Sequence, residues 1–145
     1  MDQWTKSLIM GRFALHESLS VAGDFVRLTY VKNTGAAFSL FSEQSASWRD
    51  PLLLAISVLV MGGILFSLKK INAQGTHQKI SYGLILGGAA GNFIDRVQYG
   101  AVIDFVDIGI GMNRWPVFNV ADSAVCVGVI LLVVLGFIVK GSELK

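Results

Sequence analysis

Three long stretches of this sequence contain no charged residue, and they constrain the fold more than any other feature. They are residues 51–68 (PLLLAISVLVMGGILFSL), 80–94 (ISYGLILGGAAGNFI) and 123–139 (SAVCVGVILLVVLGFIV). A helix needs about 20 mostly apolar residues, within a range of about 17–25, to cross a bilayer. The first and third stretches fit that range, and the second reaches it with a few flanking residues. We therefore expect three membrane-spanning helices, at residues 51–68, 80–96 and 120–139.

The composition also favours a membrane protein, because only 15% of the 145 residues are charged and 53% are hydrophobic. Soluble domains carry roughly 25% charged residues. The net charge of +2 is too small to indicate binding to nucleic acid. A soluble enzyme, a disordered chain and a disulfide-stabilised scaffold are excluded. The whole chain, residues 1–145, is predicted to form a single domain.

The loops predict how the spans are oriented. Residues 69–79 carry three lysines and no acid, so we place this loop on the cytoplasmic side. Residues 97–119 contain two aspartates and one arginine, so we place this loop outside. Residues 1–50 then also lie outside.

The external N-terminal segment contains a strand pattern. Apolar and polar residues alternate over most of residues 26–31 (VRLTYV), which is typical of a half-buried strand. Asn33, Thr34 and Gly35 supply turn residues, and residues 36–41 resume an apolar path. We expect a small sheet lying on the membrane surface.

Small residues are frequent in the second predicted span. In lipid, packing rather than hydrophobicity drives the association of helices, and small residues let helices approach closely. We expect Gly83 and Gly87 to form a packing face.

Four acids gather near the external ends of the last two spans. Two carboxylates that share a site hold one proton between them, so one can activate water while the other protonates a leaving group. This chemistry indicates aspartic hydrolysis, although acids that merely cap or solvate helix ends are an equal alternative. Spacing does not choose which two form the pair. The four acids are Asp95, Asp104, Asp107 and Asp122.

Two asparagines precede two of these acids by three residues. In a helix this spacing places Asn92 beside Asp95 and Asn119 beside Asp122, where an amide can orient a carboxylate. Arg96 follows Asp95 and would help to keep that carboxylate ionised.

Other chemistries have little support in the sequence. It contains no HExxH motif, no Gly-x-Ser-x-Gly motif and no phosphate-binding loop. Two function classes besides a hydrolase stay open. One is a small transporter or ion-conducting subunit whose acids bind cations, and the other is a non-catalytic membrane scaffold.

Five short motifs occur in the order of one known family. They are DQWTK at residues 2–6, NTGAAF at 33–38, GNFIDR at 91–96, VIDF at 102–105 and FNVAD at 118–122. In these motifs, and over most of its length, the chain resembles the bacterial lipoprotein signal peptidase family (signal peptidase II).

The resemblance implies roles for individual residues. It makes Asp104 and Asp122 the catalytic aspartates of an aspartic endopeptidase. Asp2 and Lys6 match further polar positions of the motifs, and their spacing would let them pair on one face of a helix. The residues expected to bind substrate or to order the active site are Asn33, Gly35, Asn92, Asp95, Arg96 and Asn119.

The resemblance also implies an activity and a location. The family removes the signal peptide from prolipoproteins that carry a diacylglyceryl-modified cysteine, and it cleaves on the amino side of that cysteine. It uses no metal and no cofactor. We therefore expect a multi-pass protein of the bacterial cytoplasmic (inner) membrane, in contact with lipid, with its active site at the external face. We also expect a monomer and no nucleic acid partner.

The fold implied by the resemblance has four membrane helices, an external β-cradle and a small external helix near the active site. Residues 24–41 would belong to the cradle, and residues 97–117 to the loop that bears the external helix. The chain begins at the motif that ends the family's first helix. We therefore expect a membrane all-α bundle of three spans with a small external β-cradle. We also expect either a native reading frame that begins upstream with the missing helix or an N-terminally shortened form.

Overall fold

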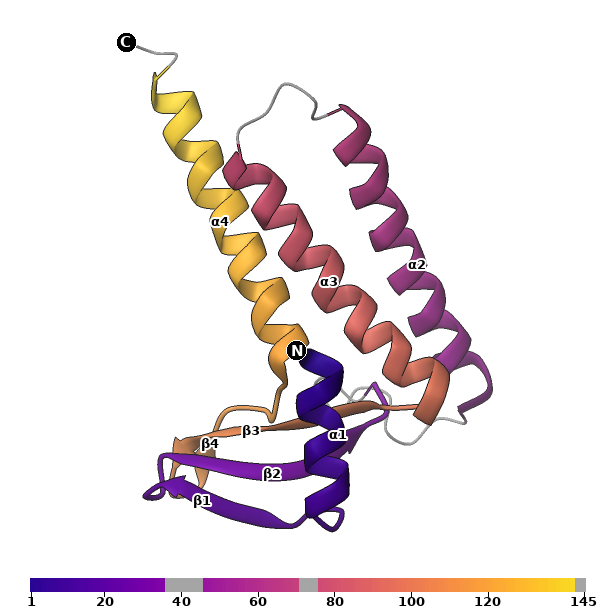
Figure 1. Cartoon of the computed structure of the whole chain (residues 1–145), viewed down its shortest axis with the longest axis vertical. Coiled ribbons are helices and arrows are strands. Elements are labelled where there is room, and N and C mark those ends of the chain that lie inside the picture. The colour runs from indigo at the N-terminus through magenta and orange to yellow at the C-terminus, as the bar shows by residue number, and fades with distance from the viewer. Residues whose placement is uncertain (36–45, 71–75, 143–145) are drawn as a thin grey trace.

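The computed structural model describes residues 1–35, 46–70 and 76–142. In Figure 1 the three long helices rise from one side of a small sheet, and the short first helix lies across the face of that sheet. The elements are α1 (Asp2–Arg12), β1 (Ser18–Ala22), β2 (Val26–Asn33), α2 (Ala46–Lys70), α3 (Thr76–Tyr99), β3 (Val102–Ile110), β4 (Asn113–Arg114) and α4 (Val120–Ser142).

The strands form one antiparallel sheet in the order β1-β2-β3-β4. The strand predicted over residues 26–31 is confirmed as β2, which pairs with β3 so that Val31 lies opposite Asp104. Residues 36–41, also predicted to belong to the cradle, lie outside the described residues.

A hydrophobic core lies between α1 and the sheet. Ile9 of α1 packs with Tyr30 of β2 and with Ile103 and Phe105 of β3, and all four side chains are buried. Each such burial contributes roughly 1.5–3 kcal/mol. This core fixes α1 on the sheet and so sets the position of its polar residues.

The segment predicted as an external loop, residues 97–119, contains β3 and β4 instead. The small helix implied for residues 97–117 is also wrong, because beyond the end of α3 this fully described segment is strand, turn and extended chain. Residues 102–105 are buried one after another, so the strand lacks the simple alternation that marks a half-exposed strand.

The three intervals predicted as spans, residues 51–68, 80–96 and 120–139, are helical and lie within α2, α3 and α4. Over the residues that the structure describes, however, no helix is both long enough and apolar enough to cross a membrane.

Two glycines let α3 and α4 approach closely. A Cβ atom added to Gly88 of α3 would lie 2.4 Å from the carbonyl oxygen of Ala121. A Cβ atom added to Gly128 of α4 would lie 2.7 Å from the carbonyl oxygen of Ser81. Both separations are too short for a real contact, so this crossing requires glycine at both positions.

The packing face predicted at Gly83 and Gly87 is wrong. An added Cβ atom at either position would have no described neighbour within 4 Å, apart from the helix's own nearby backbone. Both glycines line a groove of about 260 Å³ that also involves Met1 and Asp2. They lie on a different face of α3 from Gly88, since the helical period separates neighbouring residues by about 100°.

We expect Gly88→Ala to lower the free energy of unfolding by about 1–3 kcal/mol, because the added methyl group overpacks the contact with α4. The matched control is Gly87→Ala, which should raise stability by about 0.5–1 kcal/mol through helix propensity alone. Thermal unfolding of both variants in one detergent measures the difference. Equal shifts in melting temperature would contradict the close approach at Gly88.

Candidate active site

Five polar side chains meet where the sheet joins the long helices. They come from the end of β2, from α3, from β3, from the residue before α4 and from the first turn of α4. Each is hydrogen-bonded to at least one other member of the group. The five are Asn33, Asn92, Asp104, Asn119 and Asp122.

Asp104 is held between two asparagines. Its side chain is buried on β3, with 2% of the residue's surface exposed. Its Oδ1 accepts a hydrogen bond of 2.7 Å from Asn119 Nδ2, and its Oδ2 accepts one of 3.0 Å from Asn33 Nδ2. Both carboxylate oxygens are therefore oriented by amide N–H groups.

Asp122 is held by the cap of α4 and by α3. Its Oδ2 accepts a bond of 3.1 Å from the Asn119 backbone N–H, while Asn119 Oδ1 accepts one of 2.9 Å from the Asp122 N–H. This reciprocal pair is a capping box. The other carboxylate oxygen, Oδ1, accepts a bond of 2.7 Å from Asn92 Nδ2. Asp122 therefore caps α4, as the alternative prediction for these acids had it, and also belongs to the candidate site.

Asn119 links the two acids. It is fully buried, and its Nδ2 donates to Asp104 while its backbone N–H donates to Asp122. Burial raises the pKa of Asp104 from 3.8 to about 6; the hydrogen bond from Asn33 opposes this effect and the negative charge of Asp122 adds to it. Two nearby carboxylates, one with a raised pKa, can share a proton.

Asp95 does not join this pair. Its side chain is buried, and its Oδ2 lies 2.7 Å from the Nζ of Lys6 and accepts a bond of 3.0 Å from the Ile103 N–H. The prediction that Asn92 orients Asp95 is wrong, because the amide of Asn92 bonds Asp122 instead. Lys6 pairs with Asp95 directly, and the charge of Arg96 also interacts with that carboxylate. The expected pairing of Asp2 with Lys6 is confirmed at 2.8 Å.

Asp107 belongs neither to the pair of Asp104 and Asp122 nor to the ion pairs around Lys6. It is buried on β3, where its Oδ1 accepts a bond of 2.6 Å from Arg114 Nε and its Oδ2 accepts one of 3.1 Å from Thr29 Oγ1. The four acids therefore divide among three environments, and only Asp104 and Asp122 share one.

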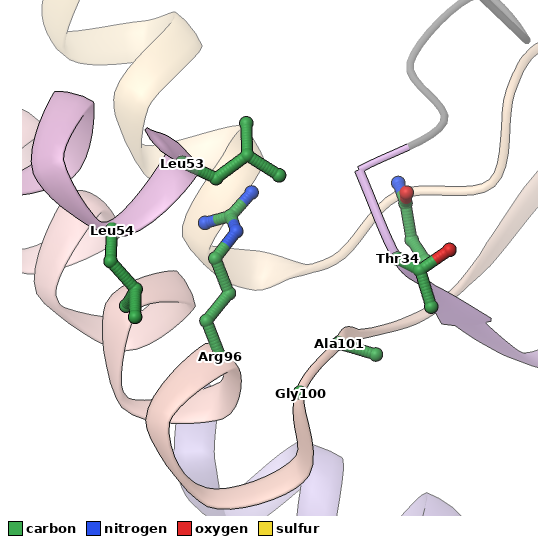
Figure 2. A pocket seen from close by; sticks show the side chains of 7 residues that line it. Thr34, Leu53, Leu54, Arg96, Gly100 and Ala101 are labelled. Atoms are coloured by element: carbon green, nitrogen blue, oxygen red, sulfur yellow. The ribbon is translucent and has the colours of Figure 1, made fainter. Parts of the chain in front are cut away.

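Arg96 and Gly35 lie beside the pair. Figure 2 shows the Arg96 side chain extending from α3 toward Leu53 of α2, in a cavity that Thr34 also lines. Gly35 donates its N–H to Asn33 Oδ1 at 3.0 Å. Its φ of 94° lies in the region that favours glycine.

Both acids border open grooves. Asp104 lines a groove of about 230 Å³ with Pro116 and Val117. Asp122 lines one of about 530 Å³ whose other walls include Trp115 and Phe118. Sequence reasoning identified neither groove. The groove at Asp104 is lined by residues distant from it in the sequence, whereas the groove at Asp122 is lined by its own sequence neighbours.

Sequence reasoning also missed Gln3. Its Nε2 donates to Asp95 Oδ1 at 2.7 Å and to the Gly91 carbonyl at 3.0 Å. The only available signal was its place in the DQWTK motif.

Within the described ranges, no group of three or more His, Cys, Asp or Glu residues could hold a metal ion.

Comparisons with known proteins agree with one another. A family model described as signal peptidase (SPase) II matches residues 1–138. The lipoprotein signal peptidase of Syntrophus aciditrophicus is 41% identical over 134 residues, which cover 92% of this chain and 83% of that protein. The lipoprotein signal peptidase of Actinobacillus succinogenes is 40% identical over 145 residues, which cover 100% of this chain and 86% of that protein.

A solved structure is also similar. A bacterial membrane enzyme determined by the in meso method at 2.3 Å resolution has a TM-score of 0.83 and 31% sequence identity, and the match covers 99% of this chain and 84% of that chain. The resemblance inferred from the five motifs is confirmed.

We expect the change in stability caused by Asp104→Asn to be more favourable at neutral than at acidic pH. The pKa of Asp104 is about 6 in the folded protein and 3.8 in the unfolded chain, so this group lowers the free energy of unfolding as the pH rises between these values. This loss is at most about 3 kcal/mol, and Asn does not incur it. The difference in melting temperature between variant and wild type should therefore be more positive at about pH 7.5 than at about pH 4.5. Equal differences at both values would contradict the raised pKa.

Proposed function

We propose, because this chain belongs to the signal peptidase II family, that it removes signal peptides from prolipoproteins carrying a diacylglyceryl-modified cysteine, and that it cleaves on the amino side of that cysteine. The observation that carries this proposal is the bridging of Asp104 and Asp122 by Asn119. This geometry suits an aspartic endopeptidase.

In the proposed reaction the two carboxyl groups share one proton. Asp104, whose pKa burial raises to about 6, is suited to hold it. Asp122 then takes a proton from water, and the water oxygen attacks the scissile carbonyl carbon. Asp104 gives its proton to the leaving nitrogen as the C–N bond breaks. At the end of the reaction Asp122 holds the proton and Asp104 is ionised.

Neighbouring groups would support this chemistry. Arg96 is close enough to both acids for their charges to interact, and its guanidinium would stabilise the oxyanion that develops on the carbonyl. Asn33 and Gly35 mark the end of β2, where the peptide backbone of the substrate would approach Asp104.

The groove beside Asp122 suits an apolar substrate. Its walls include Trp115, Phe118 and Val127, and its volume of about 530 Å³ lies within the usual range for ligand sites. A lipid-modified cysteine or the apolar part of a signal peptide would bury carbon surface there.

We place the long helices in the lipid of the bacterial cytoplasmic membrane, as a multi-pass arrangement with the sheet at the external face. Apolar side chains on these helices support this placement, because Leu59 is 73% exposed, Ile130 56% and Val133 53%. A monomer without metal or cofactor suffices for the proposed reaction.

We expect Asp104→Asn and Asp122→Asn each to lower the rate of cleavage by at least about 10³-fold. The introduced asparagine side chain cannot exchange a proton with water or substrate as the carboxyl group does. The measurement is the gel shift of a diacylglyceryl-modified prolipoprotein in detergent micelles. Asp107→Asn is the control, and it should keep most of its activity per folded molecule because Asp107 pairs with Arg114 away from the site.

Substantial turnover by either dyad variant would contradict the mechanism. If the unaltered chain left the prolipoprotein uncut, the proposed function would be wrong. Loss of ion flux in Asp104→Asn without any cleavage would instead indicate a transporter.

We expect the activity of the unaltered chain to follow a bell-shaped pH profile with its alkaline limb near about pH 6, because the proposed reaction needs Asp104 protonated and burial raises the pKa of Asp104 to about 6. Both apparent pKa values belong to the coupled pair. A chelator such as EDTA should not change the rate. Loss of activity in EDTA and its recovery with added metal would contradict the proposed reaction.

A further inference from the structure

Three asparagine side chains donate N–H groups to the two acids, and each is fixed in one orientation. An amide can rotate by half a turn and exchange its oxygen for its nitrogen, which would point an acceptor at the carboxylate. The orientation therefore depends on what holds the amide oxygen. Asn33 Oδ1 accepts from the Gly35 N–H, and Asn119 Oδ1 accepts from the Asp122 N–H.

Asn92 is the member whose amide oxygen is held by a side chain from another element. Its Oδ1 accepts a bond of 3.0 Å from Lys6 Nζ and one of 3.1 Å from Asn119 Nδ2. A lysine ammonium has three donors and no acceptor, so only the amide oxygen can face it. Nδ2 must then face Asp122, to which it donates at 2.7 Å.

We propose that Lys6 is a positioning residue that fixes the direction of hydrogen bonding from Asn92 to Asp122, and so keeps an N–H donor aimed at the proposed catalytic carboxylate. This inference rests on the proposed function, and it adds a residue of α1 to the machinery of that reaction.

The surroundings of Lys6 hold its ammonium in one place. The residue is buried, with 1% of its surface exposed. Asp2 lies 2.8 Å from Nζ, Asp95 lies 2.7 Å from it, and Asn92 Oδ1 lies 3.0 Å from it, so the three donors have three partners. The donor that neither carboxylate takes is the one that faces Asn92.

Both carboxylates around Lys6 are anchored in turn. Asp2 Oδ1 accepts a bond of 3.0 Å from the Ala121 N–H at the start of α4. Asp95 Oδ1 accepts a bond of 2.7 Å from Gln3 Nε2. The ammonium therefore has little freedom to turn away from Asn92.

The positive charge of Lys6 also reaches the site, where it opposes the rise in the pKa of Asp104. Loss of that charge should raise the pKa of Asp104 further, whereas loss of a nearby negative charge should not. The charged groups gathered here are Lys6 and Asp2 of α1, Asp95 and Arg96 of α3, Asp104 of β3 and Asp122 of α4.

The test compares Lys6→Met with Asp2→Asn in the prolipoprotein cleavage assay. Each variant removes one partner of the same buried ion pair, but only the first removes the donor to Asn92. For Lys6→Met we expect turnover per folded molecule to fall at least about tenfold and the alkaline limb of the pH profile to move up by at least about half a pH unit.

For Asp2→Asn we expect the alkaline limb not to move up, because this change removes a negative charge. Its loss of turnover should be less than about threefold, since the hydrogen bond from Lys6 to Asn92 persists. Equal losses in the two variants with unshifted profiles would show that Lys6 is only a structural ion-pair partner, and would overturn the inference.

A double variant, Lys6→Met with Asp2→Asn, covers the case in which Lys6→Met alone does not fold. It removes one positive and one negative charge together and leaves Asp95 with its bonds from Gln3 and the Ile103 N–H. We expect turnover to stay at least about tenfold low, because the Asn92 amide oxygen has lost its charged donor and keeps only the hydrogen bond from Asn119 Nδ2. Recovery to the rate of the unaltered chain would overturn the inference. Failure of the unaltered chain to cleave would instead refute the proposed function.

Discussion

A buried ammonium group is the constraint on which the rest of this structure depends. Removing a charged group from water is strongly unfavourable unless opposite charges and hydrogen bonds compensate. Lys6 meets this condition through Asp2 of its own helix and Asp95 of α3. Because Asp2 also accepts from the Ala121 N–H and Asp95 from the Ile103 N–H, this one cluster ties α1 to α3, β3 and α4.

The same cluster helps to order the candidate site, because Lys6 also donates to Asn92. The proposed acids come from a strand and from a helix end, and amides anchored at their oxygens approach them from β2, α3 and the capping residue of α4. Polar groups that are aligned before the reaction need not reorganise during it, which favours developing charge. No described buried side-chain nitrogen or oxygen atom lacks a hydrogen-bond partner.

Local pattern predicted the local features. Apolar runs predicted α2, α3 and α4, alternation predicted β2, and i, i+4 spacing predicted the pairing of Asp2 with Lys6. It did not reveal β3, whose motif residues 102–105 are buried one after another. Nor could it select among the four acids, because their partners come from other elements, as Lys6 does for Asp95. The family resemblance selected Asp104 and Asp122, and in the structure both accept hydrogen bonds from Asn119.

The capping box at Asn119 and Asp122 has a consequence for biosynthesis. The chain places Asp104 well before Asp122, and Asp122 takes up its orientation only when the first turn of α4 has formed and its cap has closed. A nascent chain therefore holds one acid without its counterpart until α4 has been made and docked against α3. Under the proposed mechanism the chain is inactive until α4 begins to form on α3, because the same capping bonds that start this helix also orient Asp122 in the proton-sharing pair.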